Sequence, residues 1–291
     1  MKIDPKILDE MTWSFSRIHS WDTGCKYGWW LTYVLPQILK QTLPDDVYHF
    51  VRGNLKKEGN FFSDYGSYIH GLLDKYGKEQ LDIFSILDEC KKHYDENIKH
   101  EAPPNKFCDL ADTYRSQAEA YFSNFDGFNQ YKILFTEKEV KFKTKYNRDF
   151  IGYIDIGLED VETGKITLGD HKSKKKFTSK KEQKEYARQL YIYSKPFKEI
   201  YGKYPDYLAF NLFRVQDKVI IPFKKTDFTE AENWIENTIQ DIYNATEFPM
   251  IANDNDFMCS QLCNWRFCCN WKQVLEHKEE MESSEDKDEG D

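Results

Sequence analysis

The chain has 291 residues, 40% of them hydrophobic and 16% aromatic, which is enough for one generous core or two modest ones and excludes a disordered body. It contains no run of about 18 apolar residues and no basic-then-apolar leader, so we expect a soluble, intracellular protein with no membrane partner. The formal net charge of -9 argues at first against a nucleic-acid partner, because phosphate binding depends on Lys and Arg.

The acidic excess lies at the carboxyl end. From Glu276 to Asp291 there are nine acidic residues and two lysines, a net charge of -7, which leaves about -2 for residues 1–275. This tail has too little apolar surface to fold, and we interpret it as a solubilising disordered end, with a self-inhibitory mimic of DNA as the alternative. The charge of the body therefore does not exclude nucleic acid.

The first 130 residues are predicted to be mostly helical. A serine-capped, aromatic stretch that contains Cys25 is interpreted as a buried helix. A linker-like stretch with LPDDV and RGNLKKEGN leads to a second helix, which carries His70 among apolar residues at helical spacing: Tyr68, Ile69, Leu72 and Leu73. Helical segments from about Gln80 to Phe125 are separated by a break at Pro103–Pro104.

Strand signals follow. Three consecutive strands are predicted at KEVKFKT, FIGYIDIGLED and KITLGDHKS, the last two joined by a hairpin turn at Thr163–Gly164. A helix opened by a capping box of Ser179 and Glu182 comes next, then strands at DYLAFNLFRV and KVIIPFKK, and a helix from about Thr229 to Asn244.

This order predicts an α/β (α+β) fold with a small mixed sheet flanked by helices. We expect four regions: a helical amino-terminal region at 1–130, a sheet-containing core at 131–248, a cysteine segment at 249–275 that packs on the amino terminus, and the acidic tail at 276–291.

Two carboxylates and a lysine stand out in the strand pair. Asp155 interrupts an apolar strand, where a charge is costly unless it is paired or bound to a metal, and Asp170 ends the partner strand. A hairpin would bring these carboxylates close together, and Mg²⁺ is a natural occupant of such a pair. Lys172 emerges on the same face as Asp170 and could steer a metal-bound water or hold a developing phosphorane charge. A surface ion pair is the alternative, since Asp-x-Lys alone is a weak signal.

The context of these residues is more specific. The order of motifs resembles that of the RecB-like branch of the PD-(D/E)XK nuclease superfamily: Gly-Tyr-Ile-Asp on one strand, a hairpin, Gly-Asp-His-Lys-Ser, and then a helix with Gln189 and Tyr193. The likeness is close over about residues 135–200 and extends more loosely to the Gly-x-x-x-His pattern that ends at His70. It implies a restriction-endonuclease-like core.

The resemblance also implies a role for each site residue. Asp155, Asp170 and the main-chain carbonyl of His171 would bind a catalytic Mg²⁺ or Mn²⁺ ion, with His70 as a further ligand. Lys172 would orient or activate the attacking water. A buried histidine with a purely structural role remains the alternative for His70.

Further residues would position the DNA. Gln189 and Tyr193, one helical turn apart, would face the site, although Tyr193 could also be a plain core aromatic. Glu139 resembles a recurring acidic position of the family, where the residue contacts the metal ligands without binding the metal. Glu137 lies on the same face of the strand and is the alternative for this position. The basic run at 173–181 favours phosphate contacts, with a solvated loop as the alternative.

Four of the seven cysteines crowd into residues 259–269, a spacing that suits zinc or an iron–sulfur centre. The layout resembles that of AddB-type subunits and CRISPR-associated four-cysteine exonucleases, which implies a [4Fe–4S] cluster held by Cys25, Cys259, Cys263 and Cys269. The Cys259–Cys263 spacing is one residue longer than in those proteins, Cys268 is left as a spare thiol, and zinc or no metal stay open.

We therefore expect a metal-dependent DNA nuclease that hydrolyses phosphodiester bonds with a metal-activated water, as an exonuclease on single strands or DNA ends. The alternative is a non-catalytic nucleic-acid-binding or complex-forming module that keeps the nuclease fold and an Fe–S or zinc site. We expect a cytoplasmic protein of a bacterial, archaeal or phage-infected cell, and the setting could be recombination and repair, phage replication or CRISPR spacer acquisition. Because no helicase P-loop is present, unwinding would require a helicase or recombination partner.

Overall fold

The structure is a computed structural model that describes residues 2–54, 58–250, 257–267 and 269, and it divides into two compact units. One unit comprises Met1–Met11, Ser16–Asn60 and the described part of Thr238–Asp291, and the other comprises Thr12–Phe15 and Phe61–Asn237. The predicted acidic tail and Cys268 lie outside the described residues. None of the helices in the described ranges has an apolar stretch of the length that crossing a membrane requires.

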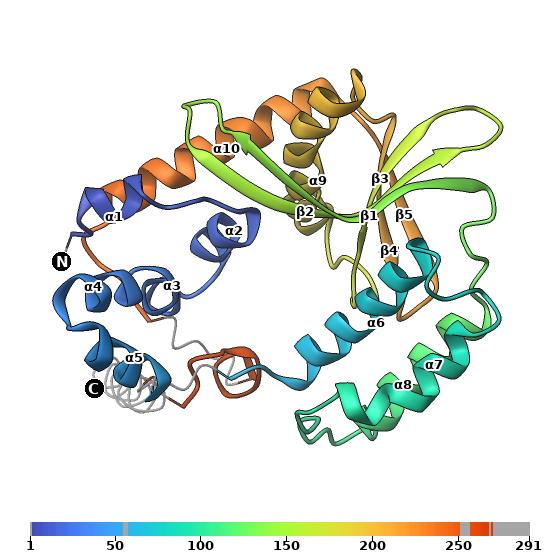
Figure 1. Cartoon of the computed structure of the whole chain (residues 1–291), viewed down its shortest axis with the longest axis horizontal. Coiled ribbons are helices and arrows are strands. Elements are labelled where there is room, and N and C mark those ends of the chain that lie inside the picture. Colours follow the sequence, from blue (N-terminus) through green and yellow to red (C-terminus); the bar gives the residue numbers. More distant parts are fainter. Residues whose placement is uncertain (1, 55–57, 251–256, 268, 270–291) are drawn as a thin grey trace, which may run out of the picture. The chain divides into compact units, whose positions relative to one another are not determined.

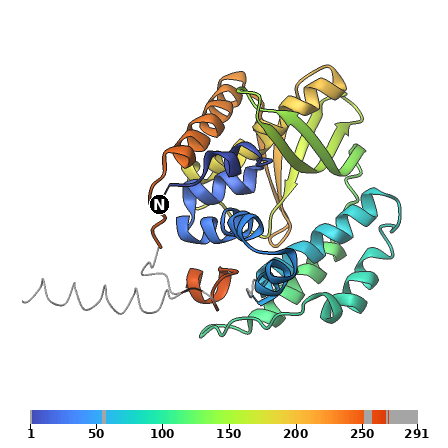
Figure 2. The same ribbon diagram turned by 60° about the vertical axis from the view of Figure 1, so that its left-hand side comes forward.

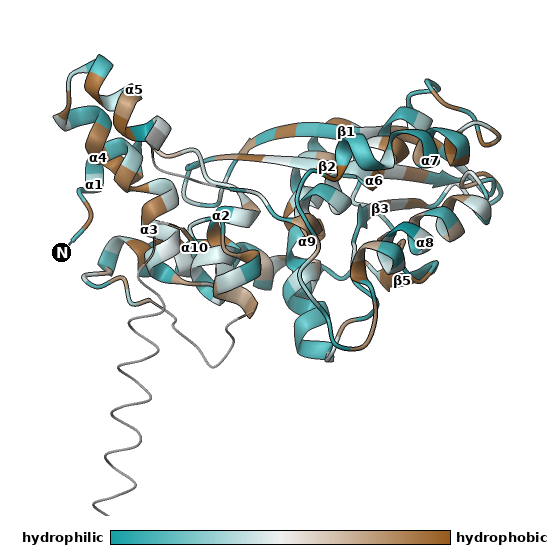
Figure 3. Ribbon diagram, turned by 90° about the horizontal axis from the view of Figure 1, so that it is seen from below, coloured by the Kyte–Doolittle hydropathy of each residue, from teal (hydrophilic) through white to brown (hydrophobic). Residues whose placement is uncertain are grey.

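The unit with Phe61–Asn237 is built around a five-stranded sheet whose strands follow the chain order: β1 (Tyr131–Lys143), β2 (Asp149–Asp160), β3 (Ile166–His171), β4 (Tyr207–Leu212) and β5 (Asp217–Pro222). Only β3 and β4 run parallel among these neighbouring pairs. A parallel pair needs a crossover, and α9 (Lys180–Tyr201) supplies it. Hydrophobic and hydrophilic residues alternate along β1 (Figure 3), as in a strand with two unlike faces.

Helices pack on both faces of this sheet (Figures 1 and 2). On one face, α6 (Phe61–Gly77), α7 (Ile86–Asn97) and α8 (Leu110–Ser123) share a hydrophobic core with Ile156 and Leu158 of β2. On the other face, α9 packs against β1 to β4. The last helix, α10 (Lys225–Asn244), carries the buried Glu236, which accepts hydrogen bonds from the backbone of Tyr146 and from Arg148 in the turn between β1 and β2.

The predicted fold class is confirmed: the sheet is mixed, helices flank it, and the amino-terminal region is helical. Ser179 caps α9 as predicted, with its hydroxyl accepting from the backbone of Glu182. The predicted start of α10 at Thr229 is wrong. The helix begins at Lys225, and the Thr229 hydroxyl donates to the Lys225 carbonyl, one turn earlier in the same helix, instead of capping its start.

The other unit contains short helices: α1 (Pro5–Asp9), α2 (Phe15–Thr23), α3 (Lys26–Tyr33), α4 (Leu35–Thr42), α5 (Asp45–Asn54), the end of α10 and a π-helical turn, η1 (Met258–Leu262). Two predictions are wrong here. Part of the stretch interpreted as a linker lies in α5, and the single helix expected through Cys25 is two helices, α2 and α3. The helix is interrupted at Gly24, where a β-carbon would lie 2.6 Å from the Ser20 carbonyl oxygen. Cys25 then caps α3, since its sulfur accepts a hydrogen bond from the backbone N–H of Gly28.

Candidate active site

The alternation of side chains along β1 is interrupted at Glu137. Thr136 donates a 2.6 Å hydrogen bond to Asp74 of α6, and the next residue, Glu137, also points to α6, where its carboxylate lies 3.7 Å from His70. Glu137 adopts φ = 42°, a conformation that costs about 1–3 kcal/mol for a residue with a β-carbon. Lys138 then returns to the α9 side, over the ring of Tyr201. The strained residue therefore turns one more acidic side chain toward the face that α6 covers.

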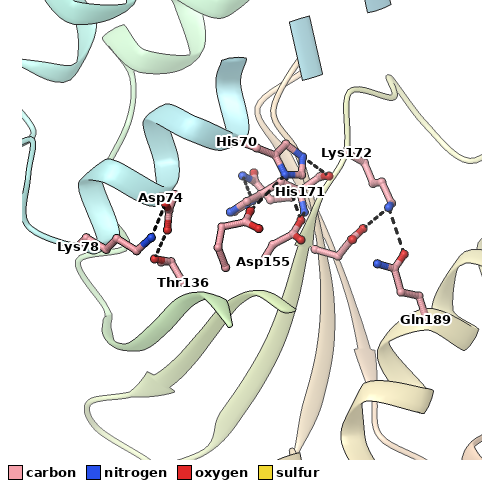
Figure 4. Close-up of polar contacts among 11 residues, drawn as sticks. His70, Asp74, Lys78, Thr136, Asp155, His171, Lys172 and Gln189 are labelled. Atoms are coloured by element: carbon pink, nitrogen blue, oxygen red, sulfur yellow. Dashed lines mark hydrogen bonds and ion pairs between the residues drawn. The ribbon is translucent and has the colours of Figure 1, made fainter. Parts of the chain in front are cut away.

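His70 lies at the centre of a group of possible metal ligands (Figure 4). Its Nδ1 is 3.5 Å from a carboxylate oxygen of Asp155, and its Nε2 is 2.8 Å from the main-chain carbonyl oxygen of His171. One ligand atom from each of His70, Glu137 and Asp155 lies within 4.8 Å of the others, and no second such group occurs in the described ranges.

A second carboxylate and a lysine lie next to this group. The backbone N–H of His171 donates to Asp155 at 2.7 Å, which ties the end of β3 to β2. Lys172 Nζ lies 2.7 Å from Asp170 and 3.4 Å from the side-chain oxygen of Gln189 on α9. The buried Asp170 carboxylate is thus paired with the Lys172 ammonium.

Burial makes the charges in this site interdependent. Asp155 is 9% exposed and Asp170 only 2%. Burial, and then the charge of Asp170, raises the pKa of Asp155 to about 7. Burial lowers the pKa of His70 and of Lys172, but the surrounding carboxylates outweigh it, so both pKa values lie above the ordinary ones. The site is an acidic, desolvated group of side chains that favours a cation.

The sequence prediction missed Asn211, which sits beside His171 in the parallel pairing of β3 and β4. Its carbonyl accepts from the backbone of Lys172 at 2.9 Å, and its amide donates to the hydroxyl of Tyr121 and lies 3.0 Å from Nδ1 of His171. Burial lowers the pKa of the His171 imidazole well below its usual value, so the ring is neutral. The available signal was a single amide in an otherwise apolar strand.

The structure does not bring Glu139 to the site. Its carboxylate is exposed, where it pairs with Lys141 at 2.7 Å and accepts from the Tyr153 hydroxyl at 2.7 Å. Glu137 occupies the position nearest His70 instead. The two residues lie on the same face of the sheet, but Glu139 is two positions farther along β1, opposite Tyr153 and away from His70.

The predicted cysteine ligands lie in the other unit, where Cys25, Cys259, Cys263 and Cys269 line one cavity of about 440 Å³. The indole of Trp265 donates to Thr32, and Arg266 donates to the Gly59 carbonyl, so the segment around η1 is attached to the amino-terminal helices. Within the described residues, no three of the sulfurs lie within 4.8 Å of one another.

The fold and the site match a known family. Residues 12–270 match the sequence model of the PD-(D/E)XK nuclease superfamily. The chain belongs to this superfamily. Its general activity is therefore that of a metal-dependent nuclease that acts on phosphodiester bonds. A comparison with curated proteins gave no match.

Two motifs of this PD-(D/E)XK nuclease touch each other. The ring of Tyr193 on α9 packs on Gly152 of β2 so closely that a β-carbon at Gly152 would lie 2.3 Å from a ring carbon. The Tyr193 hydroxyl meets the Gln189 side chain and the backbone of Tyr153. Gly152 is thus required for the approach of α9 to the strand that carries Asp155.

We expect Gly152→Ala to destabilise the protein by about 1–3 kcal/mol, because the buried ring of Tyr193 has no room to move away. Thermal unfolding measures this loss. The control is Gly66→Ala on α6, where no atom lies within 4 Å of the added carbon and helix propensity should maintain or raise stability. Equal unfolding temperatures for Gly152→Ala and the unmodified protein would show that the contact is not tight.

Proposed function

We propose that this site is the catalytic centre of a DNA exonuclease of the RecB-like branch, which acts on single strands or DNA ends. The observation that carries the proposal is the convergence of His70, Asp155, Asp170 and Lys172, from α6, β2 and the end of β3, on one buried point. The order of motifs supports the branch, and the cysteine layout, which resembles that of four-cysteine exonucleases, supports action on ends.

The donor set fits a hard divalent cation. Asp155, Asp170 and the His171 carbonyl offer oxygen ligands of the kind that Mg²⁺ and Mn²⁺ prefer, and His70 adds a nitrogen. Asp170 is almost completely buried, so its charge favours a bound cation in addition to the Lys172 ammonium. We propose these four residues as the ligands, with Glu137 supporting His70. When bound, the ion would lower the pKa of a water molecule and neutralise charge on the scissile phosphate.

The remaining residues of the site handle the water and the DNA. Lys172 is held between Asp170 and Gln189, so its ammonium would donate to the attacking water or to a non-bridging phosphate oxygen on which charge develops. Gln189 and Tyr193 would keep α9 and the DNA strand in place. Beyond Lys172, the exposed Lys175 and Lys176 would contact neighbouring phosphates.

The cysteine cavity supports a [4Fe–4S] cluster more than zinc. A tetrahedral zinc ion with Zn–S bonds of about 2.3 Å needs sulfurs about 3.8 Å apart, closer than any three described here. A cluster spans a wider set of thiolates, and the cavity of about 440 Å³ between Cys25, Cys259, Cys263 and Cys269 accommodates it. We propose that the cluster joins segments from both ends of the chain and stabilises the fold. A helicase or recombination partner would supply unwinding.

Digestion of end-labelled single- and double-stranded DNA with Mg²⁺ or Mn²⁺ tests the catalytic assignment. We expect Asp155→Asn, Asp170→Asn and Lys172→Met each to lower the cleavage rate by at least about 100-fold, because each removes a charge that acts on the reacting phosphate.

The matched control for these variants is Asp74→Asn. Asp74 lies on α6 one helical turn after His70, but its carboxylate binds Thr136 and Lys78 (Figure 4). This variant should cleave at the normal rate. Full activity of purified Asp170→Asn would contradict the proposal, and DNA binding without cleavage by the unmodified protein would favour a non-catalytic module.

Iron and sulfide analysis after anaerobic purification tests the cluster. The full chain should contain iron and absorb visible light, and Cys25→Ser should lose both, because one of four ligands is removed. Cys108→Ser, an exposed cysteine in the other unit, should retain them. Stoichiometric zinc, or iron content unaffected by Cys25→Ser, would contradict the assignment.

A further inference from the structure

One face of the β1–β2 ribbon continues past the metal-ligand group and carries exposed side chains. Gly152 faces Tyr193 and Lys138 faces Tyr201, so both point to α9. Their strand neighbours Glu139 and Tyr153 are directly paired and point the opposite way, to the side of the sheet on which His70 lies. Tyr153 is 48% exposed there, whereas the next residue, Ile154, is 1% exposed.

The Tyr153 ring is both exposed and fixed. Its hydroxyl donates to Glu139 at 2.7 Å, and Glu139 is in turn held by Lys141 at 2.7 Å. A ring that is already held in one orientation loses little conformational entropy when a flat ligand stacks on it. The arrangement therefore suits an aromatic ligand better than a freely rotating side chain would.

The charges on this face are balanced. Lys141 pairs with Glu139, and Lys143 pairs with Asp149 at 2.7 Å. A phosphate track needs an excess of positive charge, and the exposed lysines of this protein's site follow Lys172 instead. The β1–β2 face thus matches the uncharged part of a nucleotide, the base, while the proposed metal site, once it holds a cation, and the lysines match its phosphates.

The spacing agrees with this division. Tyr153 and Asp155 are two residues apart on one strand, about 6.6 Å along β2. A base that lies on Tyr153 would therefore belong to a nucleotide next to the phosphate at the metal ligands. A base in a duplex has both faces covered by its neighbours and must unstack before it can lie on the ring.

We propose that Tyr153 is a stacking platform for one unpaired DNA base next to the scissile phosphate, and that it gives the enzyme a preference for single-stranded ends. The inference rests on the proposed function of the site and adds a substrate-binding residue that contacts the base. Exposure alone does not distinguish Tyr153, since Phe84 and Phe107 are more exposed, at 88% and 94%. Its position beside Asp155 does.

Binding of a fluorescent single-stranded oligonucleotide to the full-length protein, with Ca²⁺ in place of Mg²⁺ to prevent cleavage, tests the proposal. Tyr153→Ala should weaken binding about 10-fold, within the range for loss of one base stack, and Tyr153→Trp should restore it. Phe84→Ala, which removes an aromatic ring elsewhere on the same unit, should bind normally. Double-stranded DNA with blunt ends should bind all variants alike.

A scan with abasic nucleotides makes the test specific. In the unmodified protein, one abasic position near the cleaved bond should weaken binding about 10-fold, and in Tyr153→Ala the same position should have no effect. The proposal is overturned if no abasic position weakens binding, if the loss persists in Tyr153→Ala, or if Phe84→Ala loses as much.

These outcomes are separate from the proposed catalytic function. Normal cleavage with no abasic effect would overturn the stacking platform alone. Absence of cleavage with every divalent ion would overturn the catalytic function, while the binding scan would still decide the role of Tyr153. If Tyr153→Ala does not fold, the scan on the unmodified protein and on Tyr153→Trp decides.

Discussion

Two carboxylates held side by side out of water cannot both stay charged unless a cation lies between them. Asp155 and Asp170 meet this condition where the pairing of β2 and β3 ends, and burial together with their mutual repulsion raises the pKa of Asp155 to about 7. The surrounding groups respond to this charge: Lys172 is drawn to Asp170, and His70 turns one ring nitrogen to Asp155 and the other to the His171 carbonyl. The strands and α6 thus present a set of donors that a divalent ion would complete.

The strained backbone at Glu137 separates two environments on one face of the sheet. Near His70 and Asp155 this face is acidic and buried. Two residues farther along the ribbon, at Glu139 and Tyr153, the face is exposed, its charges are paired, and it carries the aromatic ring of Tyr153. Backbone strain of this kind persists only where the surroundings hold it, and here β2 on one side and His70 on the other do so. In the proposed arrangement the phosphate lies at the metal ligands and the base lies next to them on Tyr153. The same face would therefore both cleave the DNA and favour single strands.

Much of the fold could be predicted from sequence because its signals are local. Strand periodicity and the Thr163–Gly164 turn indicated the hairpin, and the hairpin in turn predicted that Asp155 and Asp170 would meet. What could not be predicted depends on tertiary context. The conformation of Glu137 has no sequence signal, and Asn211 acquires its role only through the parallel pairing of β3 with β4. At Gly24 the helix breaks with a backbone geometry in which a β-carbon would collide with the Ser20 carbonyl.

The central claim is that these side chains form one divalent-metal site, and a crystal of the full chain soaked in Mn²⁺ tests it most directly. The anomalous signal should show manganese within about 2.0–2.3 Å of Asp155, Asp170, His70 and the His171 carbonyl, and Asp155→Asn should remove it. Manganese bound elsewhere, or an unoccupied pocket at saturating Mn²⁺ with both carboxylates ordered, would contradict the account.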